Sequence, residues 1–523
     1  MAEIAFTAPH HAASQAGYDV LNAGGSAIEA MVCAAAAIAV AYPHMNSLGG
    51  DGFWLIHRPG EAPVAIDACG ISAALATPSF YQGESHIPER GGRACVTLGG
   101  TLAGWELALA SDPDRQFSLE HLLAPARTLA EEGITVTESL VRASHKTFEA
   151  LHGLPAFAEL FLDDGKVLTV GNRLRNPGMV KLLDDLAAQG LESAYRGQIA
   201  STICATLERE GSPLRLTDYA AYQAKTVTPL SVTTRHGQLY NLPAPTQGIA
   251  SLIILALYDR LWRSDWSEAE RVHHLVECIK QAFLVRDREV TDPSRLSERW
   301  HELLTDQSLD ALAAKVDPAQ ALDWPRPSAA GDTIWMGAVD KQGTMVSFIQ
   351  SVYWEFGSGV VVPEYGLIMN NRGTSFSLDP RHPNALKPGV RPFHTLNPAM
   401  ALFSDGRRLA YGTMGGEGQP QTQAAVFSRY AYEGLSLEEA IEQGRWLLGR
   451  TWGEVSHSLK LEADLAAMIN AELMALGHET SEVPVRSELM GHAGAVLCHA
   501  DGRADSATDP RSDGAALQGR ASG

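Results

Sequence analysis

Tight turns between short strand-like runs fill the last third of this 523-residue chain. Residues 340–343 (DKQG), 404–406 (SDG) and 500–502 (ADG) each join two runs with the pattern of a β-hairpin. Amphipathic helical patterns lie between the hairpins, at residues 421–432, 436–447 and 461–476. Because hairpins and amphipathic helices must both bury an apolar face, the sequence predicts stacked sheets with helices outside them.

The first seventy residues predict the same mixture of elements. Residues 11–22 have helical spacing, and Ser26 can cap a second helix that runs to about Tyr42. Residues 53–58 and 62–68 resemble two strands joined by a Pro-Gly turn.

Residues from about 115 to 310 are expected to be mainly helical, and residues 271–287 have the clearest apolar side. His273 and His274 in this helix are a tempting metal pair. However, we find no carboxylate or histidine at ligand spacing on the same face, so the sequence predicts no metal site.

Charge and hydropathy exclude two kinds of partner. The net charge is −20, whereas a nucleic acid or an anionic membrane surface would favour a basic protein. The alanine-rich run at residues 28–41 carries Glu29 and is too short to span a bilayer, so it predicts a buried helix.

The six cysteines indicate a reducing compartment. They are scattered along the chain and form no C-x-x-C pair, which favours reduced, packed thiols. The first residues have neither a basic stretch nor an apolar stretch of a secretion signal. We therefore expect a cytoplasmic protein.

Thr333 lies where a proline-rich stretch, residues 323–327, gives way to strand-like sequence. Cleavage of the chain between Asp332 and Thr333 would leave one residue with a hydroxyl nucleophile and a free α-amine as its base. The alternative is that Thr333 only begins a β-strand, as threonine often does.

Residues 412–420 (GTMGGEGQP) follow a strand and precede a helix. Backbone N–H groups at such a turn can hold an anion or a developing oxyanion. A nucleotide site is the rival interpretation, but no Gly-Lys-Ser/Thr follows and the glycine spacing differs from the dinucleotide fingerprint. An ordinary helix-opening turn stays a third possibility.

Short segments along nearly the whole chain resemble the γ-glutamyltranspeptidase family of N-terminal-nucleophile hydrolases. They occur in the family's order: NAGGSAIEA (22–30), YPH (42–44), LGGDGF (48–53), FGSGV (356–360), GLIMNN (366–371), RPFHTLNP (391–398), MGG (414–416) and DPR (509–511). The resemblance implies an α+β fold, a four-layer αββα sandwich, and a precursor that cuts itself.

On the family pattern the cut falls before Thr333 and gives a large subunit, 1–332, and a small subunit, 333–523. The two would stay together as a heterodimer, with a dimer of such pairs left open. The Thr333 hydroxyl would attack first the Asp332 carbonyl and later the substrate amide. Its α-amine, with a reference pKa of about 7.7–8.0, can act as the base, and no cofactor is implied.

The resemblance also implies the neighbours of the nucleophile. Ser351 matches the position of a second hydroxyl residue, which is usually threonine. Gly415 and Gly416 match the pair of oxyanion donors.

The substrate positions depart from the pattern of members that act on γ-glutamyl compounds. Cys69 stands where those members have an arginine for the substrate α-carboxylate, and Ser375 stands where they have an aspartate for the α-ammonium. Arg372 adds a cation nearby, so we expect a site for a carboxylate without an α-amine. Alternatively, Arg372 points to solvent or pairs structurally.

Tyr353 replaces an asparagine of the family pattern, and His394 and Thr395 replace a serine pair. Tyr353, Trp354 and His394 would make the predicted pocket smaller. Oxamate fits this description, because it has one carboxylate, one amide and no ammonium. A subgroup of the family hydrolyses oxamate to oxalate and ammonia in purine-nitrogen salvage, and we favour that substrate.

Several alternatives stay open. Glutathione or another γ-glutamyl compound is the second choice of substrate, with hydrolysis or acyl transfer as the reaction, and a glutaryl-type amide is the third. The chain could also be an uncut, non-catalytic binding or scaffold protein on this fold, or a nucleotide-binding protein that uses residues 412–418.

Overall fold

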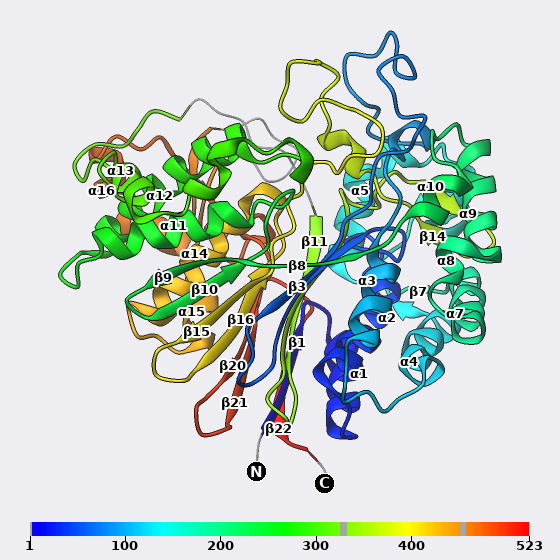
Figure 1. Ribbon diagram of the computed structural model, residues 1–523, viewed down its shortest axis with the longest axis horizontal. Helices are drawn as coiled ribbons and strands as arrows, with labels where there is room; N and C mark the ends of the chain where they lie inside the picture. Colours follow the sequence, from blue (N-terminus) through cyan, green and yellow to red (C-terminus); the bar gives the residue numbers. More distant parts are fainter. Residues whose placement is uncertain (1–2, 325–331, 450–456, 522–523) are drawn as a thin grey trace.

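Two antiparallel sheets lie face to face in the computed structural model, and helices cover the outer face of each (Figure 1). The structure describes residues 3–324, 332–449 and 457–521. The proline-rich stretch predicted before Thr333 therefore lies partly outside the described residues.

The first sheet combines strands from both sides of Thr333. In the described part of the chain its order is β22 (Ala515–Arg520), β1 (Glu3–Ala8), β11 (Asp332–Val339), β12 (Met345–Tyr353), β2 (Asp51–His57), β3 (Val64–Ala68) and β8 (Lys225–Val227). β11, which carries Thr333, is hydrogen-bonded to β1 on one edge and to β12 on the other. A cut before Thr333 would thus leave both parts of the chain joined within one sheet.

The second sheet has the order β21 (Ala504–Thr508), β20 (Ala493–Cys498), β16 (Arg408–Thr413), β15 (Ala399–Phe403), β10 (Gly237–Asn241) and β9 (Leu230–Thr234). The three predicted hairpins are confirmed, since β11–β12, β15–β16 and β20–β21 are antiparallel neighbours.

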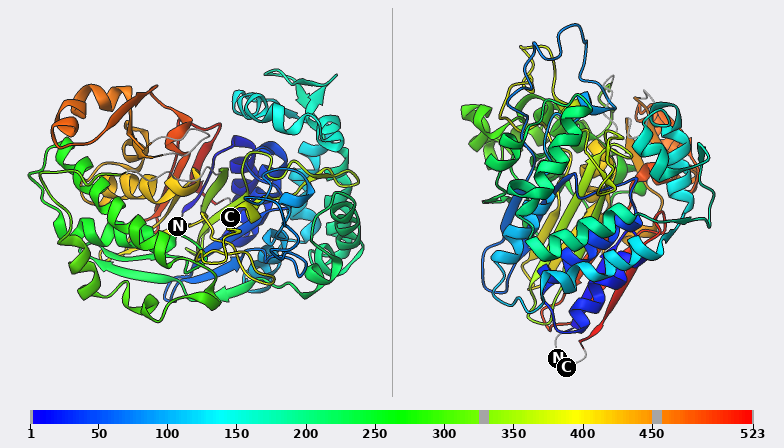
Figure 2. Two further views of the ribbon diagram at one scale, coloured as in Figure 1. Left: turned by 90° about the horizontal axis from the view of Figure 1, so that it is seen from above. Right: turned by 90° about the vertical axis from the view of Figure 1, so that its right-hand side faces the viewer.

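Three hydrophobic cores separate the layers. Phe53, Trp335 and Met400 belong to the core between the two sheets. A second core lies under α1 (His11–Asn22), α2 (Ala27–Ala41), α3 (Thr101–Ala110) and α4 (Leu119–Glu132), and a third under α11 (Gly248–Leu261), α12 (Glu268–Glu289) and α14 (Gln419–Ala431). The view from above shows helices on both outer sides of the strands (Figure 2). The predicted four-layer αββα sandwich is confirmed.

The remaining elements extend the helical layers. They are β4 (Ile134–Thr135), α5 (Glu138–Leu151), α6 (Pro155–Phe161), β5 (Leu162–Asp163), β6 (Lys166–Val167), β7 (Arg173–Leu174), α7 (Pro177–Gln189), α8 (Ser193–Arg196), α9 (Gln198–Arg209), α10 (Leu216–Ala221), α13 (Asp306–Ala313), β13 (Val361–Val362), β14 (Leu367–Ile368), α16 (Ala463–Ala475) and β19 (Thr480–Val483). The prediction of a mainly helical stretch from 115 to 310 is confirmed, although short strands interrupt it.

Local sequence explains why α2 can be a fully buried helix. The Ser26 hydroxyl accepts from the Glu29 N–H at 3.0 Å, and a Glu29 carboxylate oxygen accepts from the Ser26 N–H at 3.0 Å. This capping box satisfies the first turn, so the alanine-rich face can be surrounded by apolar neighbours. No helix within the described ranges is both long and apolar enough to cross a membrane.

One predicted helix is wrong in its second half. Residues 436–447 form α15 (Leu437–Glu442) and then β17 (Trp446–Leu448), which pairs with β18 (Leu459–Glu462). The chain turns inward because the Arg445 side chain, fully buried, pairs with Asp509. A tertiary ion pair thus overrides the helical pattern of the sequence.

We predict that Ser26→Ala lowers the free energy of unfolding by about 1–2 kcal/mol, because it leaves a buried N–H group without its acceptor. Ser267→Ala removes the same kind of cap from the solvent-exposed start of α12 and is the matched control. Thermal unfolding should show a larger decrease in melting temperature for Ser26→Ala, and equal decreases would contradict this account of α2.

Candidate active site

Thr333 is the second residue of β11 and lies in a break of strand register. Asp332 pairs with Tyr353 and Ile334 pairs with Gln350, so Thr333 lies across from two residues of β12, Ser351 and Val352. Such a bulge redirects side chains near the end of a strand. The register thereby brings Ser351 beside Thr333, as the sequence predicts, and the Thr333 side chain is buried.

The glycine turn approaches Thr333 from the second sheet. The Gln419 amide Nε2 donates to Thr333 Oγ1 at 3.5 Å, and Gln419 begins α14 directly after the 3₁₀ turn Gly416–Gly418. Gly415 has φ +123° and Gly416 has φ +54°, backbone conformations that favour glycine. Among the residues that the structure describes, neither glycine N–H makes a hydrogen bond, so both can still act as donors.

Arg372 is buried without a carboxylate partner in the described part of the chain, and its side chain is 1% exposed. Nη1 donates to Thr395 Oγ1 at 3.1 Å, and the guanidinium carbon lies 3.8 Å from the centre of the Tyr353 ring. Within the same described residues Nε and Nη2 have no hydrogen-bond acceptor. The alternative that Arg372 points to solvent is wrong.

Burial without an anion is costly for a cation. Loss of solvation lowers the pKa of Arg372, and the nearby Asp51 opposes that shift only in part. A carboxylate placed against Nε and Nη2 would satisfy both donors and the charge together. The geometry therefore favours an anionic ligand at this position.

Tyr353 covers the guanidinium face of Arg372, and Ser375 lies beside Tyr353. Tyr353 ends β12 with φ +85°, a rare conformation for a bulky side chain that is typical of functional sites. Burial raises the pKa of the Tyr353 hydroxyl, so it stays protonated at neutral pH. The Ser375 hydroxyl is buried at the end of the turn Arg372–Ser375 and lies beside the Tyr353 hydroxyl.

His394 is held in place by a hydrogen bond to Asp51. Its Nδ1 accepts from the Leu396 N–H at 3.3 Å, so the proton is on Nε2, which donates to Asp51 Oδ2 at 3.0 Å. Burial, together with Arg372, lowers the pKa of His394 to about 4, so the ring is neutral near pH 7. Since both ring nitrogens are engaged, His394 shapes the predicted substrate pocket and offers it no spare polar atom.

Cys69 stands where the family resemblance places an arginine, and no neighbouring residue in the described structure supplies that positive charge instead. Its thiol is buried and donates to the Gly70 carbonyl at 3.3 Å. Burial raises the pKa of Cys69 well above its usual range, so the thiol is uncharged. Arg391 lies close by, but its Nε pairs with Asp67 Oδ2 at 3.1 Å. Arg372 is thus the buried cation of the described site that lacks a carboxylate.

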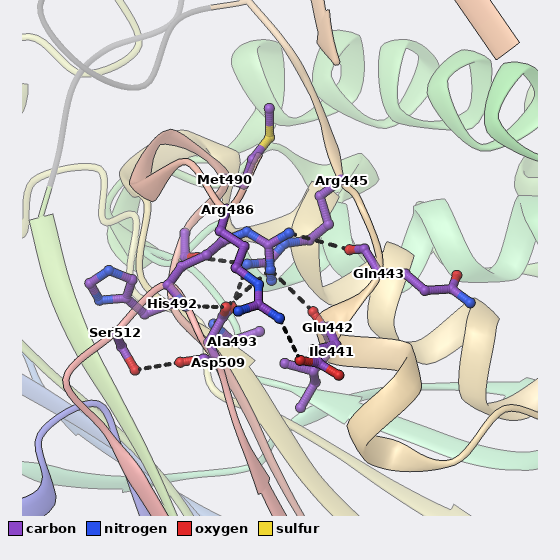
Figure 3. Close-up of polar contacts among 12 residues, drawn as sticks. Ile441, Glu442, Gln443, Arg445, Arg486, Met490, His492, Ala493, Asp509 and Ser512 are labelled. Atoms are coloured by element: carbon purple, nitrogen blue, oxygen red, sulfur yellow. Dashed lines mark hydrogen bonds and ion pairs between the residues drawn. The ribbon is translucent and has the colours of Figure 1, made fainter. Parts of the chain in front are cut away.

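A buried ion pair, Arg445 with Asp509, lies within a network of polar contacts that includes His492 and Ala493 (Figure 3). Arg445 pairs with Asp509, and its Nη2 also donates to the Gly491 carbonyl at 2.9 Å. Asp509 accepts from the Ala493 N–H at 2.7 Å. The carbonyl of His492, the residue after Gly491, accepts from the Met414 N–H at 3.4 Å. The DPR motif therefore acts on the residue that precedes Gly415.

The prediction that no carboxylate follows His273 at metal-ligand spacing on the same helix face is wrong. Glu277 lies one helical turn on, and His478, distant in sequence, completes a group whose donor atoms lie within 4.8 Å of one another. These atoms are already bonded within the protein: His273 Nδ1 contacts His478 Nε2 at 2.8 Å, and Glu277 pairs with Lys280 at 2.7 Å. The group thus has a complete explanation as a buried polar cluster.

Four residues that contact the site were missed from the sequence. Asp51 and Gln419 are described above; Gln247 donates to the Gly416 carbonyl, and Arg286 pairs with Glu417 in the glycine turn. Asp51 and Gln419 lie inside motifs already singled out, LGGDGF and the glycine turn, so closer reading of those motifs could have found them. Gln247 and Arg286 carry no local signal, since their importance arises from contacts more than one hundred residues away in sequence.

Comparisons with known proteins show what the whole chain is similar to. The family model described as Gamma-glutamyltranspeptidase matches residues 13–519. The chain is 50% identical to an oxamate amidohydrolase proenzyme of Klebsiella pneumoniae subsp. pneumoniae, with 97% of each chain covered. It is 36% identical to the glutathione hydrolase-like YwrD proenzyme of Bacillus subtilis, again over 97% of each. The crystal structure of a cephalosporin acylase from Bacillus halodurans superposes with a TM-score of 0.90 at 30% identity, covering 99% of this chain and 95% of that one.

The neutral state of His394 predicts a pH dependence. Between pH 6.5 and about 4 the unfolded chain protonates this histidine and the folded chain does not, so the free energy of unfolding falls as pH falls through this window. His394→Gln does not titrate and should lack roughly 3 kcal/mol of that fall.

Melting temperatures of wild type and His394→Gln, measured from pH 7.5 to 4.5, should converge as the pH is lowered. A difference that stays constant over this range would contradict a neutral, Asp51-bound His394.

Proposed function

This chain belongs to the γ-glutamyltranspeptidase family, and we propose that it is a self-processing amidohydrolase whose substrate is oxamate. It would cut itself before Thr333 and then release ammonia and oxalate. The observation that carries the choice of substrate is the buried guanidinium of Arg372, which has two donors without acceptors in the described structure. The oxamate amidohydrolase proenzyme at 50% identity supports the same choice.

The proposed processing step needs only Thr333 and water. The Thr333 hydroxyl attacks the Asp332 carbonyl carbon, the peptide C–N bond breaks, and the acyl group moves from nitrogen to oxygen. Water then hydrolyses the ester, which regenerates the hydroxyl and leaves an α-amine on Thr333. Pairing of β11 with β1, and of β12 with β2, supports the proposal that the parts 1–332 and 333–523 remain a heterodimer.

In the proposed turnover, the Thr333 α-amine takes the hydroxyl proton while the oxygen attacks the amide carbon of oxamate. The N–H groups of Gly415 and Gly416 stabilise the oxyanion. The amide nitrogen leaves as ammonia with the transferred proton, and water hydrolyses the ester to release oxalate. Ser351 and Gln419 would orient the Thr333 hydroxyl.

The substrate carboxylate would bind Arg372 at Nε and Nη2, in the fork geometry that suits carboxylates. Tyr353 stacks on the guanidinium face and Thr395 accepts from Nη1. The edge formed by Nε and Nη2 is then the one without an acceptor in the described structure. Ser375, a neutral residue, lies where an ammonium would need an anion. A substrate with a carboxylate and no α-amine follows from these charges.

A γ-glutamyl substrate is the second candidate. The chain is 28% identical to a glutathione hydrolase proenzyme of Escherichia coli. Such a substrate brings an ammonium into a site whose uncompensated charge is already positive, which costs electrostatic energy. A glutaryl-type amide avoids that cost but is longer than oxamate. Location in the cytoplasm and a role in purine-nitrogen salvage stay predictions from the sequence.

Intact mass of the purified protein tests processing. Wild type should give two chains, the smaller beginning at Thr333, and Thr333→Ala should stay a single chain because it lacks the nucleophile. Thr333→Ser keeps a hydroxyl and is the control that should still be cut. An active wild-type enzyme that remains one chain would contradict the proposed nucleophile.

Steady-state kinetics test the substrate. We expect kcat/KM for ammonia release from oxamate to exceed that for glutamate release from glutathione by at least about 100-fold, since one opposed charge is worth roughly 3 kcal/mol in a buried site. The reverse order would make the protein a γ-glutamyl enzyme.

Arg372→Ala should raise KM for oxamate by roughly 10- to 100-fold with a smaller change in kcat, because it removes charge-assisted hydrogen bonds to the bound carboxylate. A neutral amide without the carboxylate is the control substrate, and its slow turnover should not decrease further in the variant. An unchanged KM for oxamate would remove Arg372 from the site.

A further inference from the structure

Gln247, which precedes α11, contacts both halves of the proposed site. Its backbone N–H donates to the His394 carbonyl at 2.9 Å. Its side-chain Nε2 donates to two carbonyls at once, Thr395 O at 2.8 Å and Gly416 O at 2.9 Å. We propose that Gln247 is a positioning residue that sets the separation between the carboxylate-binding side and the oxyanion side of the site. This inference rests on the function proposed above.

Arg286 determines which way the Gln247 amide points. Arg286 Nη1 donates to Gln247 Oε1 at 3.0 Å, and a guanidinium has no acceptor atom. The amide oxygen must therefore face Arg286, which directs the NH₂ group to the two carbonyls. Arg286 Nη2 pairs with Glu417 Oε2 at 2.9 Å, so the orienting cation is itself held by the glycine turn.

The two carbonyls belong to segments with different proposed roles. The Thr395 hydroxyl accepts from Arg372, so the Thr395 backbone sets where the cation lies. Gly416 follows Gly415 in the glycine turn and carries one of the two proposed oxyanion donors. The direction of its carbonyl fixes the plane of the peptide between Gly416 and Glu417. One NH₂ group thus joins the partner of the substrate carboxylate to the donors for the oxyanion, and Gln247 is fully buried.

A small substrate makes this separation important. In oxamate the carboxylate carbon is bonded directly to the amide carbon, so no flexible linker can absorb a mismatch between the two sides. Reactive geometry must then be held within about 0.5 Å by surrounding hydrogen bonds, and a small misplacement reduces rate strongly. Gln247 supplies such a restraint from the part of the chain that precedes Thr333.

Gln247→Glu is the sharpest test. It keeps the size of the side chain and an oxygen for Arg286, but it presents a second oxygen to two carbonyl oxygens. On processed protein we expect kcat for oxamate to fall about 10- to 100-fold and KM to rise at least about threefold. Gln247→Leu should behave similarly.

Gln421→Leu is the matched control for a purely structural effect. Gln421 is also buried, and its amide donates to Leu448 O at 3.0 Å and accepts from Leu448 N–H at 2.8 Å. It should lower the melting temperature about as much as Gln247→Leu while kcat/KM stays within about twofold of wild type. Equal kinetic losses in both variants, or kcat/KM within twofold for Gln247→Glu, would overturn the inference.

Self-cleavage separates this inference from the choice of substrate, because it uses Thr333 without any added amide. If wild type cuts itself but ignores oxamate, the proposed substrate fails, and the inference is judged on cleavage rate. Gln247→Glu should then slow cleavage at least about tenfold and Gln421→Leu should not. Equal rates for Gln247→Glu and wild type would overturn the inference, and a wild type that never cuts would overturn both proposals.

Discussion

The position of β11 between β1 and β12 is the constraint on which the site depends. β12 pairs along β11 as far as Asp332, whereas β1 pairs only with residues 337–339, so Thr333 lies at the end of the strand beyond the β1 edge. Two residues further on, Trp335 projects toward the second sheet and packs where Gly412 has no side chain: a Cβ on Gly412 would lie 2.2 Å from the indole. Since Gly412 is three residues before Gly415, this close contact brings the glycine turn beside Thr333. The nucleophile and the proposed oxyanion donors are thus aligned by the packing of one sheet on the other.

The buried charges discussed for the site, all within the described residues, differ in how they are paired. Asp509 with Arg445, and Asp67 with Arg391, are ion pairs, and each also holds a backbone N–H group of a turn. Breaking such a pair would leave an uncompensated buried charge. Arg372 is already in that condition within the described structure, with a hydroxyl and an aromatic face in place of a carboxylate. The cost of leaving Arg372 unpaired is the observation behind the proposal that a ligand supplies the missing charge.

Local signals in the sequence were sufficient for most of the fold. Helix α1, the Ser26 cap of α2 and the three hairpin turns depend on residues close together in the chain, and each is found as predicted. The prediction failed at α15, where Arg445 turns toward Asp509, sixty-four residues away. The same limitation hid Gln247 and His478, whose partners are 169 and 205 residues distant. Motifs located Thr333 and Arg372, but only the fold shows that Arg372 is buried and that both nitrogens of His394 are occupied.

The residues proposed for the reaction and those proposed for specificity lie on separate structural elements, an arrangement that would let one family accept different amides. Thr333 and the glycine turn belong to the two packed sheets, whereas Arg372 and Ser375 belong to a short 3₁₀ turn outside them. That turn is anchored by Asn370: its Nδ2 donates to Gly49 O at 3.0 Å, and its Oδ1 accepts from the Arg372 N–H at 3.0 Å. Because the anchor is a side chain bonded to backbone atoms, residues 372–375 can change charge without moving the strands. A new cation there would alter which acid is bound while the nucleophile, its bulge and the oxyanion donors stay in place.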